Sequence, residues 1–512
     1  MAGIFAILKK NKLKSIKKKL IKKCALKLKH RGTVHTFKYE KFPLSLFYHQ
    51  NKPFSNNRIL NFSFSENNTD FIVIDGQIYN LKDLNIKYNK VKDVSKDSNL
   101  NLISLLNGFR EFGPKIFTQT LGSYSGVLYL NHELYAFKDP IGAKPLYYCI
   151  TDNFFAVSSE LKALTLLNKT ILPLEPGNVI SSSGKKRKFF QFPNIIKKYS
   201  ISLKFVNNIK RELNKLIRKV VINNIQDEEK IGLLLSGGVD SVIINHIAKD
   251  LVSDLRVYTV GTEESKDLSF ASEIANRYDL DHSIVKFTLH DLLDVLPEVI
   301  YALETFDAGL IRSAIPMFII SRHIEETNHV KVILTAEGGD ELFGGYDYLD
   351  GLKTIDSLNE GLLNLINNEY KKGLQVNDRI PYYFSIEART PLFDRRLVEF
   401  SLKIPPELKI FKNKYGKATK WILRKAFEKE IPEEFIWRKK QKFTDGDRSQ
   451  FFIRNYVKNK ITNEEFEKEK QITPSITLRS KEELYYWRIF NSKFRLSEES
   501  LLEIGVTNNF KV

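Results

Sequence analysis

The chain has 512 residues, of which 42% are hydrophobic and 28% charged, the balance of a globular protein and not of a disordered one. Two cysteines exclude a disulfide-built fold and make the cytoplasm the expected location, and no run of about 18 apolar residues predicts a transmembrane helix. The net charge of +19 suits nucleic acid, but no RNA-binding, zinc-finger or basic-zipper signature accompanies it, so we expect no nucleic-acid partner.

The N-terminus predicts a buried strand followed by a basic helix. The segment MAGIFAIL (1–8) is almost wholly apolar, as is typical of a strand in a core. The segment 9–29 is rich in lysine and carries apolar residues at helical spacing, namely Leu13, Ile16, Leu20, Ile21, Cys24 and Leu28. The preceding strand favours a helix with one buried face and one solvated basic face; a membrane-surface or transit helix is the alternative.

Residues 1–195 are predicted to form a domain rich in β-strands. The segments 71–81 (FIVIDGQIYNL) and 124–139 (YSGVLYLNHELYAFKD) carry β-branched and aromatic residues broken by turn residues. Asn131 and His132 lie inside the second segment and predict a hairpin turn between paired strands. The segment 192–204 is the expected link to a second domain.

From residue 205 onward, strands are predicted to alternate with amphipathic helices. Strands are expected within 229–238, 256–261, 282–288 and 330–339, and helices within 239–251 and 267–279. This alternation predicts a parallel, doubly wound α/β sheet. Beyond about residue 350 the pattern is mostly helical, and we place the second domain at residues 205–505.

The stretch LLLSGGVDS (233–241) predicts a nucleotide-phosphate site. A short apolar strand runs into consecutive glycines, which let a ligand approach the backbone, and the next helix offers free N–H groups to an anion. Asp240 is a candidate magnesium ligand, and Ser236 and Ser241 can bond phosphate oxygens. The stretch is neither a Walker loop nor a dinucleotide-binding GxGxxG. A glycine-rich turn with a capping aspartate is the plainer alternative.

A second loop, TAEGGDELFGGYDYL (335–349), supplies further carboxylates. Glu337 and Asp340 lie in a glycine-rich turn beyond the carboxyl end of a predicted strand. Open α/β sheets bind their ligands at that end of the strands. The alternative is a simple surface turn. Three acids within five residues, beside four glycines, argue against that alternative.

Four stretches of the C-terminal half together resemble asparagine synthetase of the glutamine-hydrolysing type: SGGVDS, TAEGGDELFGGY, IEARTPLFD (386–394) and IWRKKQKFTDG (436–446). HRG (30–32), DGQIYN (75–80) and VSSELKAL (157–164) resemble, in eroded form, the family's glutaminase domain. The resemblance implies an N-terminal antiparallel β-sheet domain of the N-terminal-nucleophile glutaminase type. The C-terminal domain would be a doubly wound ATP pyrophosphatase with a pyrophosphate-binding loop.

The resemblance also implies a two-step reaction. The side-chain carboxylate of aspartate attacks the α-phosphorus of ATP, giving β-aspartyl-AMP and diphosphate, and ammonia then displaces AMP to give asparagine. Asp240 and Asp340 would coordinate Mg²⁺, which neutralises charge that repels the carboxylate. The small-molecule partners would be aspartate, ammonia and ATP; a homodimer is compatible with the sequence, which does not determine the oligomeric state.

The same resemblance implies an ATP site built from residues of several loops: Leu234, Ser236, Gly237, Gly238, Asp240, Ser241, Val260, Thr335 and Ala336. Thr335 and Ala336 stand where the family usually has Ser-Gly. Glu337 matches the catalytic glutamate, a candidate proton acceptor. Lys440 matches a lysine whose charge would stabilise the transition state, with a solvated basic face as the alternative. Arg312 is our candidate for the substrate α-carboxylate, since arginine binds carboxylates through paired hydrogen bonds.

The glutaminase half departs from the family at its reactive residues. Ala2 stands where the family has a nucleophilic cysteine, which becomes the N-terminus once methionine is removed. Asp75 stands where an asparagine donates an N–H to the oxyanion, although Gly76 still offers a backbone N–H. Asp97 is a weak match to the acid that binds the glutamine amino group. We therefore predict an ammonia-dependent enzyme with a degenerate glutaminase domain.

Three alternatives stay open from the sequence alone. The first is another ATP-dependent amide-forming ligase of the same family, for example one resembling β-lactam synthetase. The second is a tRNA-modifying pyrophosphatase, which would fit the basic charge. Thiolating enzymes of that kind need reactive cysteines, and Cys24 and Cys149 both lie outside the ATP domain, which argues against this alternative. The third is a non-catalytic partner protein. The intact candidate site residues argue against it, namely Asp240, Glu337, Asp340 and Lys440.

Overall fold

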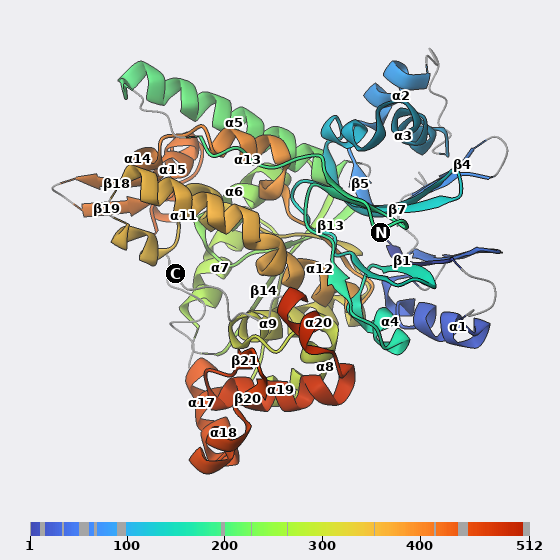
Figure 1. Ribbon diagram of the computed structural model, residues 1–512. Coiled ribbons are helices and arrows are strands. Elements are labelled where there is room, and N and C mark those ends of the chain that lie inside the picture. The colour runs from blue at the N-terminus through green and yellow to red at the C-terminus, as the bar shows by residue number, and fades with distance from the viewer. Residues whose placement is uncertain are drawn as a thin grey trace.

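The structure is a computed structural model that describes residues 2–10, 16–32, 35–50, 61–65, 69–89, 99–195, 200–226, 228–263, 265–352, 354–413, 416–438 and 449–504. Two antiparallel sheets form the first part of the chain, and a parallel sheet surrounded by helices forms the second (Figure 1). The predicted fold class is therefore confirmed.

The N-terminal part stacks two six-stranded antiparallel sheets on one another. The order in the first is β10 (Leu172–Pro173), β8 (Tyr147–Ile150), β9 (Phe154–Ser158), β1 (Ala2–Lys9), β3 (Leu44–Gln50) and β2 (His35–Lys41). The order in the second is β12 (Lys186–Lys188), β11 (Asn178–Ser181), β7 (Glu133–Lys138), β6 (Gly122–Leu130), β5 (Phe71–Ile78) and β4 (Phe62–Phe64). Ile4, Leu46, Val73 and Val127 belong to the apolar core that both sheets share.

The predicted hairpin turn is confirmed, but the predicted basic helix (9–29) is shorter than expected, because β1 extends to Lys9 and Leu13 lies outside the described residues. Asn131 and His132 connect β6 to β7 with φ of 50° and 64°, the backbone that a two-residue hairpin turn requires. The basic segment forms α1 (Lys18–Leu26), which buries Ile21 and Cys24 and leaves its lysines exposed. Helices α2 (Leu81–Asn89) and α3 (Asn99–Phe112) share a second core with the outer face of the second sheet, and α4 (Leu161–Leu164) follows β9.

The C-terminal part is built on a five-stranded parallel sheet. Its order is β15 (Asp281–Lys286), β14 (Asp254–Gly261), β13 (Lys230–Leu234), β16 (Val332–Leu334) and β17 (Glu387–Arg389). Helices α5 (Leu203–Ile225), α6 (Val239–Ala248) and α7 (Lys266–Arg277) share a core with one face of it. Helix α9 (Ala308–Thr327), backed by α8 (Leu289–Leu303), packs on the other, so the sheet is doubly wound.

The region beyond residue 350 is mostly helical, as predicted, but it also contains strands that the sequence did not indicate. Strand β17 pairs with β16, and two hairpins join β18 (Ile410–Asn413) to β19 (Gly416–Thr419) and β20 (Gln471–Thr473) to β21 (Ile476–Thr477). β17 has only three residues, two of them charged, so no periodicity marks it. The other helices of the C-terminal part are α10 (Gly339–Phe343), α11 (Ile355–Asn368), α12 (Gly373–Tyr383), α13 (Arg395–Ser401), α14 (Pro406–Lys409), α15 (Trp421–Phe427), α16 (Glu433–Ile436), α17 (Ser449–Lys460), α18 (Asn463–Glu469), α19 (Lys481–Phe494) and α20 (Glu498–Ile504).

Helix α12 connects the two parts of the molecule. It contacts α9 and β17 on the C-terminal side, and the short 3₁₀ helix at Lys29–Arg31 on the N-terminal side. Its Asn377 bonds Glu337, while the next residue, Asp378, bonds Arg31. Among the described residues, no helix is both long and apolar enough to span a membrane.

Candidate active site

Two predicted loops leave the same edge of the parallel sheet. β13 and β16 are neighbours, with Leu233 opposite Leu334, so the loops at 235–238 and 335–338 start side by side. Because both follow the carboxyl ends of parallel strands, they form the crevice where such sheets bind ligands. The structure thus brings the two halves of the predicted ATP site together.

The other predicted nucleotide-binding residues lie at this edge as well. Leu234 and Val260 are half-buried at the ends of β13 and β14. Ala336 is half-buried, and Thr335 is buried with a hydroxyl that has no hydrogen-bond partner among the described residues. Their assignment to adenine, ribose and phosphate stays a prediction.

Hydrogen bonds within the glycine loop (residues 236–241) fix its conformation. The Ser241 hydroxyl donates to the Gly238 carbonyl at 2.9 Å, and the Gly238 N–H donates to Ser236 Oγ at 3.4 Å. Gly237 has φ of +68°, which a residue with a side chain rarely adopts. Helix α6 begins at Val239, directly after the loop, so the N–H groups of its first turn lie next to the loop.

An arginine that the sequence analysis did not single out supports this loop. Arg438 donates to the Gly237 carbonyl at 3.0 Å and pairs with Asp267 at 2.6 Å. Its guanidinium lies 3.9 Å from the centre of the Phe270 ring. A methyl group on Gly237 would come within 2.7 Å of the end of the arginine side chain, which would have to shift. The loop therefore has a fixed positive group beside it.

Asp240 and Asp340, the predicted magnesium ligands, face one buried lysine. The Lys420 ammonium lies 2.9 Å from Asp340 Oδ1 and also bonds Asp240 Oδ2. Burial alone would lower the pKa of Lys420, but the two carboxylates raise it above its ordinary value. A methyl group on Gly339 would lie 2.1 Å from Asp240 Oδ1, and one on Gly345 would lie 1.7 Å from Asp340 Oδ1. Both glycines are thus needed for the carboxylates to approach.

The same two carboxylates fit a magnesium ion by their chemistry. Asp240 is buried, and its Oδ1 has no hydrogen-bond partner among the described residues. Mg²⁺ prefers oxygen ligands and is usually held by one or two carboxylates together with substrate phosphates. Phosphates bound at the predicted loop would lie near these carboxylates, so the donor set suits the ion.

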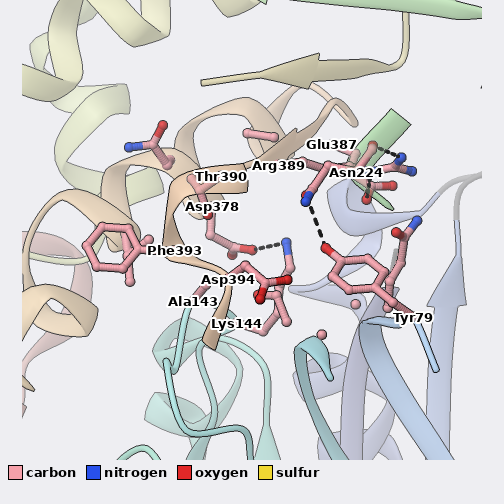
Figure 2. A pocket seen from close by; sticks show the side chains of 17 residues that line it. Tyr79, Ala143, Lys144, Asn224, Asp378, Glu387, Arg389, Thr390, Phe393 and Asp394 are labelled. Atoms are coloured by element: carbon pink, nitrogen blue, oxygen red, sulfur yellow. Dashed lines mark hydrogen bonds and ion pairs between the residues drawn. The ribbon is translucent and has the colours of Figure 1, made fainter. Parts of the chain in front are cut away.

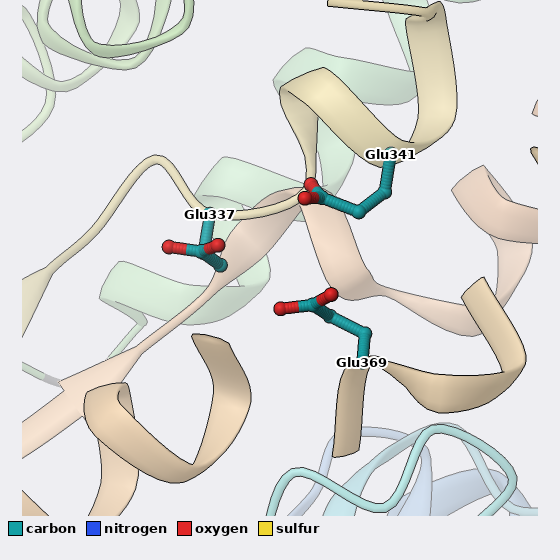
Figure 3. A group of neighbouring side chains, drawn as sticks. All are labelled: Glu337, Glu341 and Glu369. Atoms are coloured by element: carbon teal, nitrogen blue, oxygen red, sulfur yellow. The ribbon is translucent and has the colours of Figure 1, made fainter. Parts of the chain in front are cut away.

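Glu337 belongs to a compact group of three glutamates (Figure 3). Carboxylate oxygens of Glu337, Glu341 and Glu369 lie within 4.8 Å of one another. Asn377 donates to Glu337 Oε2 at 3.1 Å, and the Gly373 N–H donates to Glu369 Oε1 at 2.6 Å. Glu337 is half-buried while the other two are buried, so Glu337 is the most accessible of the three. The sequence pointed to Glu337 but not to Glu369 or Asn377.

Burial, followed by the nearby charges of Glu337 and Asp340, raises the pKa of Glu341 to about 8. Between its ordinary pKa of about 4.3 and about 8, the folded protein keeps a proton that the unfolded chain releases. The folded state binds more protons in this window, so the free energy of unfolding falls as pH rises. We expect Glu341→Gln to weaken this dependence, so that Tm, measured by calorimetry without ligands, falls less between pH 5.5 and pH 8.

Glu263→Gln is the matched control, because the Glu263 side chain is 80% exposed. This control should keep the wild-type dependence of Tm on pH. Equal falls of Tm in wild type and Glu341→Gln would show that Glu341 carries no proton in the folded state.

Of three further predicted site residues, only Arg312 lies in the part of the chain that the structure describes. Lys440 and Asp97 lie outside the described residues, so their roles stay predictions. Arg312, on α9, donates to both carboxylate oxygens of Glu482, at 2.9 and 2.8 Å. A substrate carboxylate could bind Arg312 only by sharing the guanidinium with Glu482 or by displacing the Glu482 side chain.

The region around Ala2 is filled by a buried ion network. Ala2 is fully buried, and its N–H donates to Asp75 Oδ1 at 2.8 Å. Arg31 is also fully buried and donates to the Ala2 carbonyl at 3.1 Å and to Asp75 Oδ2 at 2.8 Å. It further bonds Glu160 Oε1 at 2.8 Å and Asp378 Oδ2, on α12, at 2.9 Å. The arginine therefore ties residue 2 to the C-terminal part.

The network continues into the interface. Lys144 donates to Asp378 Oδ1 at 3.0 Å, and the Arg31 guanidinium lies 3.9 Å from the centre of the Tyr382 ring. Burial opposes the charge of Asp378, yet Arg31 and Lys144 hold its pKa below the ordinary value. Gly76 has φ of +107°, and its carbonyl accepts a bond from the Asn61 amide at 3.0 Å. Ala2, Asp75 and Asp378 are thus joined by one buried network of ion pairs and hydrogen bonds.

Comparison with known proteins gives two family matches. The family described as "Asparagine synthase" matches residues 212–372 and 352–486, and the "Glutamine amidotransferase domain" matches residues 1–178. The "Asparagine synthetase (glutamine-hydrolyzing)" of Zea mays is 28% identical over 451 residues, 84% of this chain and 76% of the relative. The "Probable asparagine synthetase (glutamine-hydrolyzing)" of Acanthamoeba polyphaga mimivirus is 29% identical over 463 residues, 84% and 82% of the two chains. "Asparagine synthetase B" of Escherichia coli (strain K12) is 28% identical over 457 residues, 85% and 80%.

Proposed function

This chain belongs to the asparagine synthase family, and from that premise we propose that it makes asparagine from aspartate, ATP and free ammonia, with a glutaminase domain kept for packing only. The chain is an AMP-forming carbon–nitrogen ligase, and ATP is its substrate. The observation that carries the preference for ammonia is the position of Ala2, fully buried, without a nucleophile and bonded to Asp75 and Arg31. We keep 1–195 and 205–505 as proposed domain limits, and the cytoplasm as the proposed location.

In the first step, a side-chain oxygen of aspartate attacks the α-phosphorus of ATP. The new oxygen–phosphorus bond forms as the bond to the β-phosphate breaks, so diphosphate leaves and β-aspartyl-AMP remains. The loop at Ser236–Ser241 would bind the diphosphate through its N–H groups. Lys420 and Arg438 supply fixed positive charge next to it. Magnesium held by Asp240 and Asp340 would neutralise phosphate charge.

In the second step, ammonia attacks the activated carbonyl carbon. A carbon–nitrogen bond forms, the bond to AMP breaks, and the nitrogen gives up one proton. We propose that Glu337, held in place by the Asn377 amide at 3.1 Å, organises adenylate formation in the first step and accepts this proton in the second. We keep Arg312 as the candidate for the α-carboxylate and Lys440 as a further phosphate contact.

Exchange of labelled diphosphate into ATP tests the first step and the identity of the acid. Purified protein, ATP and magnesium are incubated with a panel of carboxylic acids, without any nitrogen donor. We expect exchange with aspartate and little with glutamate or β-alanine derivatives. Exchange that requires a different acid would instead support a related amide-forming ligase.

Ala2→Cys alone is expected not to restore glutamine hydrolysis. The new thiol would lie in the fully buried position of Ala2, next to the Asp75 carboxylate and the Arg31 side chain. Release of glutamate from labelled glutamine measures the effect, with Ala2→Ser as the matched control. Hydrolysis by Ala2→Cys above that of Ala2→Ser would contradict this account of the N-terminal part.

A further inference from the structure

Lys420, whose ammonium faces the Asp240 and Asp340 carboxylates, has an unusual backbone conformation. Its φ is +54°, in the left-handed region that residues with a side chain rarely adopt. Lys420 directly precedes α15, so this conformation sets the direction in which its side chain leaves the chain. A strained residue of this kind persists only where its surroundings hold it in place.

Arg424, one turn further along α15, holds the backbone on both sides of Lys420. Its Nε donates to the Thr419 carbonyl at 3.0 Å, and its main-chain N–H donates to the Lys420 carbonyl at 3.0 Å. The Arg424 side chain is buried, where water competes little for its hydrogen bonds. The arginine therefore restrains the backbone from which Lys420 reaches the carboxylate pair.

The same guanidinium also holds the segment that carries Arg438. Its Nη1 donates to the Arg438 carbonyl at 3.1 Å and to the Ile436 carbonyl as well. Arg438 in turn supports the glycine loop through its bond to the Gly237 carbonyl at 3.0 Å. One buried side chain thus joins Lys420 and Arg438, the two cations that the proposed reaction places next to the diphosphate.

Arg424 also acts on the carboxylate pair through its charge. Its three side-chain hydrogen bonds go to neutral carbonyls, and none of the described carboxylates accepts a bond from it. Burial lowers the pKa of Arg424, and the negative charges of Asp240 and Asp340 oppose this shift. Because an arginine stays charged in a protein, Arg424 adds a buried positive charge to this region.

We infer that Arg424 is a positioning residue of the proposed ATP site, which holds Lys420 at the carboxylate pair and Arg438 at the glycine loop so that both act on the phosphates of ATP. This inference rests on the proposed function, because it takes the phosphates to bind at that loop. Arg424 acts through the two cations. Loss of its three bonds should therefore weaken phosphate binding even where the fold is kept.

Arg424→Lys tests the inference, because a lysine keeps the charge but lacks the planar fork that bonds three carbonyls at once. We titrate the protein with α,β-methylene-ATP and magnesium in a calorimeter. In this analogue a carbon replaces the oxygen whose bond to phosphorus breaks in the reaction, so it binds without reacting. We expect the Kd to rise by about tenfold or more relative to wild type.

Arg389→Lys is the matched control. Arg389 and Arg424 are each 5% exposed, and Arg389 also donates to a backbone carbonyl, that of Asn224, at 2.6 Å. Its other partners are Glu387 and Glu228, at 2.6 Å each, and none of the three belongs to the proposed ATP site (Figure 2). The control should lower Tm but leave the Kd for the analogue unchanged. An equal rise of the Kd in both variants would overturn the inference.

The stoichiometry of the titration separates positioning from folding. An unfolded fraction lowers the number of binding sites, whereas the Kd reports the sites that remain folded. A wild-type Kd in Arg424→Lys overturns the inference. Failure of both Arg424→Lys and Arg424→Gln to give folded protein also overturns it, because Arg424 would then serve the fold as a whole.

The titration contains no aspartate and no ammonia. A Kd raised in Arg424→Lys alone therefore supports the inference even if the exchange assay shows that the acid is not aspartate. If the wild-type protein does not bind the analogue, the proposed ATP site is refuted, and the inference is refuted with it.

Discussion

Asp240→Asn and Asp340→Asn should each reduce aspartate-dependent diphosphate release below detection, a loss of at least about 10³-fold. The two carboxylates share the Lys420 ammonium, and they are also the proposed magnesium ligands. An amide in either place removes one negative charge from the site and leaves the buried lysine with a single carboxylate. A diphosphate-release assay measures the effect.

Asp250→Asn is the matched control, because Asp250 follows α6 and its side chain is 68% exposed. It should keep wild-type activity. Circular dichroism and Tm should show that the two site variants remain folded. Wild-type exchange rates in either site variant would refute the assignment of the ATP site.

Glu337→Ala is expected to lower adenylate formation by about 10²–10⁴-fold, the usual range for a positioned acid–base group. Glu337 is the most accessible member of the glutamate group, and Asn377 fixes one of its oxygens. The measurement is initial velocity with saturating aspartate and ammonia. Glu263→Ala, at an exposed position, is the control, and equal turnover by wild type and Glu337→Ala would show that Glu337 has no chemical role.

Much of the fold was predictable because its signals are local. The strand and helix around SGGVDS are marked by apolar runs and glycines within about 20 residues of one another, and they became β13 and α6. The Asn131–His132 turn was predictable for the same reason. β17 was not, since three residues around Ala388 become a strand only by pairing with β16, more than 50 residues earlier.

The residues of the candidate site also fall into those that local motifs reveal and those that only the folded structure reveals. Asp240, Glu337 and Asp340 stand beside glycines at strand ends, and short motifs reveal them. Lys420, directly before α15, and Asn377, on α12, lie far away in the chain, and no comparable motif marks them. Arg31 lies in a recognised stretch, but its bond to Asp378 joins residues 347 positions apart and follows only from the packing of the two parts.

The most direct test of the central claim is the source of the nitrogen in asparagine. Wild-type protein is incubated with aspartate, ATP and magnesium, once with ¹⁵N-labelled ammonium chloride and once with glutamine labelled at the amide nitrogen. We expect labelled asparagine from ammonium, and no labelled asparagine and no glutamate from glutamine above a no-enzyme control. Asparagine carrying the glutamine label, formed with an equal amount of glutamate, would contradict the account.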